Sequence, residues 1–114
     1  MDKATARQIK IKTGVLKRSV KDYSYYQEEA KKEEEKLDKL KEDEAEEHDI
    51  TQQTNVMQES LDMLPHCKAK IESALEDLKG VIADHEDTDE FKDSEEGQTA
   101  VGLITEASAF LEGL

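Results

Sequence analysis

Apolar residues recur at seven-residue intervals through the first third of the chain. The main row consists of Ile9, Leu16, Tyr23, Ala30 and Leu37, and a second, partly polar row lies three positions further on. A sustained seven-residue repeat is typical of long helices that pack lengthwise. No proline interrupts the repeat, which therefore predicts one helix over residues 5–43.

A second repeat occupies the middle of the chain. Its row consists of Ile50, Met57, Leu64, Ile71 and Leu78, with further apolar positions on both sides. An apolar stripe of this width is typical of a helix that touches two neighbours, and it predicts a helix over residues 49–84. Asp49, with Gln52 three positions later, resembles a capping box at the start of that helix.

Pro65 lies inside this second predicted helix. A proline inside a helix removes one backbone hydrogen bond and clashes with the preceding turn. The apolar repeat nevertheless keeps its phase from Leu64 to Ile71. We therefore predict a continuous helix that is kinked at Pro65 and bends around a partner helix.

The last third of the chain predicts a third helix over about residues 88–111. Thr88 is a suitable N-cap because acidic residues and Phe91 follow it. The residues expected to share a face are Phe91, Val101, Ile104, Ser108 and Leu111. With hinges at about 42–48 and 84–88, the chain predicts an all-α fold, a single domain over residues 1–114 built as an antiparallel up-down-up bundle of three long helices.

The composition excludes several other classes of protein. No apolar run approaches the roughly 20 residues that a membrane-spanning helix needs, so no membrane partner is expected. The single cysteine cannot form an internal disulfide or a cysteine-based zinc site, which suits the cytosol. Five glycines, one proline and few aromatic residues disfavour a β-sandwich or barrel.

Charge is distributed unevenly, although the net charge is −13. Residues 1–21 carry seven basic residues and one acid, whereas residues 42–114 carry four basic residues and twenty-one acids. Lys10, Lys17, Arg18 and Lys21 fall away from the first apolar row and predict an outward basic stripe. The stripe is either a solvated face, paired in part with the acidic later helices, or a partner-binding face. Nucleic acid is disfavoured because the net charge repels phosphate and no aromatic platform accompanies the lysines.

The sequence lacks the constellations that catalysis or metal binding needs. None of the three histidines forms an i, i+4 pair with another, and there is no HExxH, CxxC or glycine-rich nucleotide motif. Cys67 falls in an apolar row, which indicates a core residue more than a reactive thiol, and His66 is expected at the surface. We therefore predict a protein that is not an enzyme and binds no metal or cofactor.

A short apolar strip lies on the first helix outside its main row. It consists of Ile11, Val15 and Tyr25 together with Arg18. One interpretation is that this strip packs against the third helix. The other is that it stays partly exposed beside the basic stripe and forms a protein-docking surface.

Two stretches resemble the tubulin-specific chaperone A (tubulin-binding cofactor A) family. The first runs from Arg7 to Val15 in the order Arg-Gln-Ile-Lys-Ile-Lys-Thr-Gly-Val, followed by Lys17-Arg18 and, later, by Tyr26 and Glu29-Ala30-Lys31. The second comprises Asp49-Ile50, Gln53, Gln58-Glu59-Ser60, Met63, Pro65, Cys67, Glu72, Ala74 and Asp77-Leu78. The resemblance covers roughly residues 5 to 82. It is specific, because long stretches match in order at the same spacing.

The resemblance implies a three-helix bundle with a kinked middle helix. It also implies a cytoplasmic, cytoskeleton-associated chaperone that captures β-tubulin released from the cytosolic chaperonin and holds it before assembly with α-tubulin. Other tubulin-folding cofactors would then be indirect partners. We predict that this holding works without ATP, since binding alone shifts the equilibrium of the client.

Two helical faces are the predicted partner-binding sites. The first consists of Lys10, Lys12, Lys17, Arg18 and Tyr25, and the second of Glu59, Ser60, Met63 and Pro65. The alternative function is a structural coiled-coil homodimer that tethers other proteins, with the apolar repeat facing a second copy. The two predicted hinges argue against the tether, and the sequence leaves open whether the chain is a monomer or a homodimer.

Overall fold

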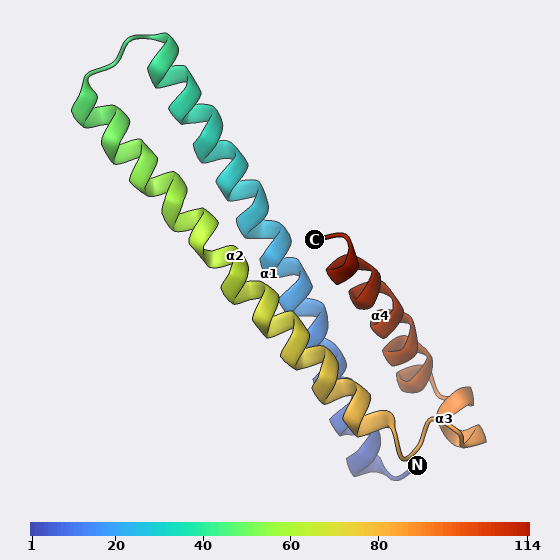
Figure 1. The fold of residues 1–114 in the computed structure, drawn as a ribbon. Coiled ribbons are helices and arrows are strands. Elements are labelled where there is room, and N and C mark those ends of the chain that lie inside the picture. The colour runs from blue at the N-terminus through green and yellow to red at the C-terminus, as the bar shows by residue number, and fades with distance from the viewer. The chain divides into compact units, whose positions relative to one another are not determined.

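The computed structural model describes all residues from 1 to 114 and contains four α-helices and no strand (Figure 1). The helices are α1 (Lys3–Glu42), α2 (Glu47–Ile82), α3 (Asp89–Asp93) and α4 (Glu95–Glu112). The all-α class therefore agrees with the prediction from the repeats. The number of helices does not, because two helices occupy the region predicted to form the third.

The turn after α1 ends that helix with a left-handed residue. The Ala45 amide donates to the Leu40 carbonyl at 3.0 Å, and the Glu44 amide donates to the Lys41 carbonyl at 3.2 Å. This is the Schellman pattern, which needs a residue with positive φ directly after the helix. Glu44 occupies that position with φ of 55°, although glycine is the usual residue there.

The start of α2 differs from the predicted one. The helix begins at Glu47, so Asp49 lies within the first turn and is not the N-cap that the sequence predicts. Both Glu47 and Asp49 place negative charge at the helix N-terminus, where the helix dipole favours it. The helix then runs as one element through Pro65 to Ile82 (Figure 1). The bend at Pro65 stays a prediction.

A single residue, Ser94, divides the predicted third helix. Thr88 caps α3 as predicted, because its hydroxyl accepts a hydrogen bond from the Phe91 amide at 3.2 Å. Ser94 has extended backbone (φ −79°, ψ 145°), ends α3 and caps α4 by accepting from the Gly97 amide at 2.9 Å. The prediction of one helix over residues 88–111 is therefore wrong.

The break at Ser94 also changes which face of the last helix is buried. Phe91 is almost fully buried, but Val101 is 47% exposed, so the two residues expected to share a face differ in burial. The buried residues of α4 are small: Gly97, Ala100 and Ala107. Across an extended residue the helical spacing from Phe91 no longer applies, and small side chains allow another helix to approach α4 closely.

The chain forms two compact units. Unit 1 consists of Met1–Val20 and Lys68–Leu114, and unit 2 consists of Lys21–Cys67. Unit 1 thus contains the first half of α1, the second half of α2, and both later helices. Unit 2 contains the second half of α1, the turn and the first half of α2.

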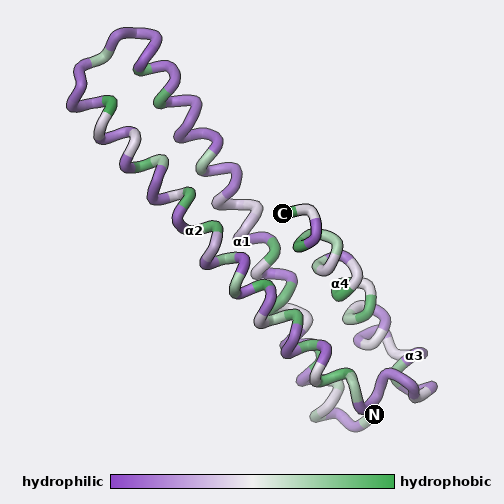
Figure 2. Tube along the Cα trace, viewed as in Figure 1, coloured by the Kyte–Doolittle hydropathy of each residue, from purple (hydrophilic) through white to green (hydrophobic).

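The predicted seven-residue row of α1 is buried within these units. Ile9 and Leu16 are fully buried in unit 1, and Tyr23, Ala30 and Leu37 are buried in unit 2. The row of α2 is buried unequally: Ile71 and Leu78 are buried in unit 1, whereas Ile50, Met57 and Leu64 of unit 2 are half-buried. The hydropathy colouring agrees, with hydrophilic residues over the α1–α2 turn and more hydrophobic ones along the second half of α2 (Figure 2). The wide stripe of α2 is therefore covered most fully in the unit that holds α4.

Candidate functional site

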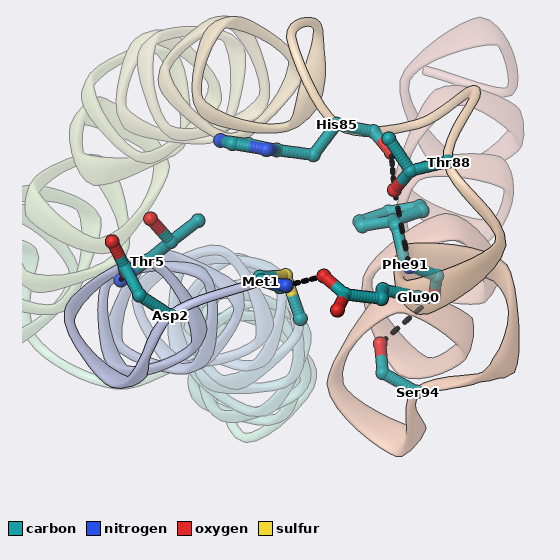
Figure 3. A network of polar contacts seen from close by, with 8 residues as sticks. All are labelled: Met1, Asp2, Thr5, His85, Thr88, Glu90, Phe91 and Ser94. Atoms are coloured by element: carbon teal, nitrogen blue, oxygen red, sulfur yellow. Dashed lines mark hydrogen bonds and ion pairs between the residues drawn. The ribbon is translucent and has the colours of Figure 1, made fainter.

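A polar network at the start of α1 is structural in character. The Asp2 carboxylate accepts a hydrogen bond from the Thr5 amide at 2.7 Å, and the Met1 amino group forms an ion pair with Glu90 (Figure 3). The bond from Thr5 is the main reason that the pKa of Asp2 is lowered, with a smaller contribution from the nearby His85. These contacts cap α1 and connect its start to α3.

Two lysines of the predicted basic stripe of α1 lie beside α4. Lys10 lines a hollow of about 260 Å³ together with Glu95 and Glu96 of α4. Lys17 lines a second hollow of about 290 Å³ together with Glu106 of α4. These two lysines therefore lie beside acids of α4, but neither forms the ion pair with a later helix that one interpretation of the stripe expects.

Lys12 lies on the opposite side of α1, beside α2. Its ammonium group is 4.0 Å from the Asp77 carboxylate, and both side chains are partly exposed. An ion pair of this length in partial contact with solvent contributes little to stability. It does neutralise one positive charge on that side, whereas Arg18 and Lys21 of the predicted stripe form no ion pair.

The apolar strip of α1 is exposed. Ile11 is 54% exposed, Val15 51% and Tyr25 59%, so the interpretation that the strip packs against a third helix is wrong. Tyr25 contacts the neighbouring Tyr26 ring edge to face, with ring centroids 5.3 Å apart. Exposed apolar residues that recur on one helix are a common feature of protein-docking surfaces.

A shallow groove of unit 1 continues this strip toward α2. Val15 and Ser19 of α1 line a hollow of about 230 Å³ with Lys70, Ser73 and Asp77 of α2. Lys70 and Ser73 are not marked by the apolar pattern of α2, because the groove forms only where two helices meet. The sequence does place both residues on the same side of α2 as Asp77, within one or two helical turns of it.

The second predicted face lies on α2 within unit 2. Glu59 is exposed and Met63 is half-buried one turn later, next to the half-buried Ser60. Pro65 is exposed, but at about 100° per residue it projects roughly 120° away from Glu59. Glu59 and Met63 therefore lie on one side of α2, and Pro65 lies on another.

The remaining residues that could serve in catalysis or metal binding do not gather into one site. Cys67 is buried, as its place in the apolar row predicts, and His66 is exposed. No group of three or more histidine, cysteine or acidic side chains is arranged to hold a metal ion. None of the four helices has a stretch that is both long and apolar enough to span a lipid bilayer.

A family of known proteins matches this sequence along most of its length. The model of the family described as Tubulin binding cofactor A matches residues 4–104, which include α1, α2, α3 and the first half of α4. The chain belongs to the tubulin binding cofactor A family. The match extends further toward the C-terminus than the two stretches of resemblance noted in the sequence.

Individual family members support the assignment. Tubulin-specific chaperone A of Homo sapiens is 41% identical over 98 residues, which cover 86% of this chain and 91% of the human protein. Tubulin-folding cofactor A of Arabidopsis thaliana is 45% identical over 87 residues, covering 76% of this chain and 77% of the plant protein.

Solved structures of the tubulin binding cofactor A family share the fold. The crystal structure of tubulin folding cofactor A from Arabidopsis thaliana superposes with a TM-score of 0.85 at 37% identity, over 95% of this chain and 99% of that one. The structure of human tubulin chaperone cofactor A superposes with a TM-score of 0.75 at 36% identity, over 91% and 98% of the two chains. The all-helical arrangement described above is therefore that of the family.

Proposed function

We propose that this chain is a tubulin-folding cofactor that captures β-tubulin after its release from the cytosolic chaperonin. The observation that carries the proposal is the family match over residues 4–104, together with 41% identity to human tubulin-specific chaperone A. The protein would act in the cytoplasm near the cytoskeleton, without catalysing a reaction. Other tubulin-folding cofactors would meet it indirectly, by receiving or supplying the same client.

The proposed mechanism is holding by binding. A chaperone that covers an aggregation-prone surface shifts the client toward the bound state by mass action, which requires no hydrolysis of ATP. The exposed apolar residues Ile11, Val15 and Tyr25 support such a role, as does the placement of Glu59 and Met63 one turn apart on α2. We further propose that the two units act as one domain with up-down-up helices and a bend at Pro65.

The tether hypothesis receives no support from the burial of the repeat. A coiled-coil homodimer would need its seven-residue row to face a second copy. Ile9 and Leu16 are instead fully buried within unit 1, and Leu37 is buried within unit 2. The row is already covered by the same chain, so the chaperone remains the proposed function.

The proposal is tested by capture of newly released β-tubulin. Purified chain is added to chaperonin that carries radiolabelled β-tubulin, and the released product is separated by native electrophoresis. We expect a discrete complex of the chain with β-tubulin that forms equally well after apyrase has removed ATP from the released fraction. Release of β-tubulin without any such complex would overturn the proposal, and a complex that needs ATP would overturn its nucleotide independence.

A further inference from the structure

The groove between α1 and α2 in unit 1 has an apolar edge that no other part of the chain covers. Ile11 and Val15 lie one helical turn apart on α1, and each exposes more than half of its surface. Gly14 lies between them, and a Cβ added there would meet no atom within 4 Å. The groove beside Val15 is floored by the buried Ala74 of α2, which leaves room for an inserted side chain.

The lining of this groove contains one basic residue, Lys70, and one acid, Asp77. Arg18 follows Val15 by one turn on α1, and Lys70 lines the groove from α2; neither forms an ion pair. The one acid of the groove, Asp77, is already paired with Lys12. Arg18 and Lys70 thus stand against one further exposed acid, Asp22, one turn after Arg18. The remaining excess of one positive charge, in a chain of net charge −13, is complementary to an acidic surface.

The geometry of the groove favours a helix as its occupant. Both walls are helices whose backbone groups are hydrogen-bonded internally, so they offer no free edge to an extended strand. Binding by addition of a strand is therefore excluded, whereas a helix satisfies its own backbone and needs no such edge. Residues one turn apart on a helix are about 5–6 Å apart, which matches the spacing of Ile11 and Val15.

We propose that this groove binds an acidic amphipathic helix of the client, with apolar residues on Ile11 and Val15 and carboxylates beside Arg18 and Lys70. The proposal rests on the proposed function, because it names the chemistry by which the chaperone recognises its client. Of the predicted basic stripe of α1, the proposed site includes Arg18. Lys10 and Lys17, which lie beside the acids of α4, take no part in it.

The apolar contact is tested with Val15→Asp and a matched control, Val101→Asp. Both valines are about half exposed on helices of unit 1, and both changes add the same negative charge. We expect Val15→Asp to weaken β-tubulin binding about tenfold or more, and Val101→Asp to weaken it less than about twofold. Circular dichroism confirms that both variants fold. Equal affinities of the two variants would overturn the proposal while leaving the tubulin function of the chain intact.

The charge contribution is tested with Lys70→Glu and its control Lys68→Glu. Both lysines are exposed on α2, but Lys68 projects to the other side of the helix. We expect Lys70→Glu to lower the association rate about tenfold and to flatten its dependence on salt, because electrostatic steering acts mainly on association. A salt dependence that is the same in both variants would contradict the proposed role of Lys70.

A synthetic peptide tests binding at the groove independently of tubulin binding. We would titrate isotope-labelled chain with an 18-residue designed helix that carries leucine at i, i+4 spacing and glutamate elsewhere, and with its lysine counterpart. The acidic peptide should shift the amide resonances of residues 11–19 and 70–77, and the basic peptide should not. If the chain binds no tubulin but these shifts occur, the proposed function fails and the groove stands. Without these shifts, or if Val15→Asp converts a dimer to a monomer, the acidic helix is not the occupant.

Discussion

The side-chain amide of Gln53 donates hydrogen bonds to both the backbone carbonyl and the carboxylate of Glu33, at 3.0 and 2.7 Å. Glu33 is only 8% exposed and lies in the partly polar row of α1. Lys36 adds an ion pair to the same carboxylate at 3.2 Å. This pairing joins α1 to α2 in unit 2, where the apolar row of α2 is only half-buried, and it specifies how the two helices align.

Replacing Gln53 with alanine should destabilise the protein. The change removes both hydrogen bonds and leaves the carboxylate of a buried residue with Lys36 as its remaining partner, which costs more than the bonds alone contribute. We expect Gln53→Ala to lower the midpoint of urea unfolding, and Gln52→Ala, at an exposed neighbouring position, to leave it unchanged. Equal midpoints for the two variants would show that the pairing contributes nothing.

The same pairing predicts a dependence of stability on pH. The hydrogen bond from Gln53, followed by that from Lys36, holds the pKa of Glu33 below its ordinary value of 4.5, against a smaller opposing effect of burial. A carboxylate with a lowered pKa stabilises the fold above its unfolded pKa, and this stability is lost as the pH falls through the folded pKa. The stability difference between the wild-type protein and Gln53→Ala should be full above about pH 5 and shrink below it. A difference that is constant from pH 7 to pH 3 would contradict this assignment.

The seven-residue rows could be predicted from the sequence because they depend only on helical periodicity. Ile9, Leu16 and Leu78 lie in the apolar rows of their helices, and they are fully buried in the structure. Their burial requires only that the apolar side of each helix faces the core, whichever helix packs against it. The half-burial of Ile50 and Met57 could not be predicted in the same way. Both residues lie in unit 2, which contains no part of α4, and the division into two units is not visible in the apolar pattern of α2.

Two glycines of α4 should respond oppositely to alanine. A Cβ at Gly97 would overlap the Phe91 carbonyl oxygen and lie 2.7 Å from the Ser94 hydroxyl, so Gly97→Ala forces the α3–α4 junction to move. Overpacking of this kind costs about 1–3 kcal/mol. A Cβ at Gly102 meets nothing within 4 Å, and Gly102→Ala should stabilise the protein by about 1 kcal/mol because alanine favours helix. Thermal unfolding of both variants measures the difference, and a stabilising Gly97→Ala would contradict the described junction.

The turn after α1 offers a stabilising substitution. A residue other than glycine in the left-handed region costs about 1–2 kcal/mol, and glycine loses more backbone freedom on folding, so Glu44→Gly should yield a net gain of about 0.5–1 kcal/mol. Glu42→Gly, in the last turn of α1, should instead destabilise the helix by about the same amount. Chemical denaturation of the two variants should move the midpoints in opposite directions. A shift of both midpoints in the same direction would argue against the Schellman turn.

The candidate site was only partly predictable for a similar reason. The sequence places Ile11, Val15 and Arg18 on one side of a helix, but it does not state which side a third helix covers. In the structure the buried residues of α4 are Gly97, Ala100 and Ala107, which define the face that α4 turns inward. These small residues are inconspicuous in an apolar pattern, and the break at Ser94 removes the helical phase that would have connected them to Phe91.

The most direct test of the account is native mass spectrometry of the chain alone and with β-tubulin. If the apolar rows are covered within one chain and the outer face of α1 is left for the client, the chain alone is a monomer of 12.9 kDa. Addition of β-tubulin should then produce a complex with one copy of each protein. A homodimer that β-tubulin does not dissociate, or no complex at all, would contradict the account.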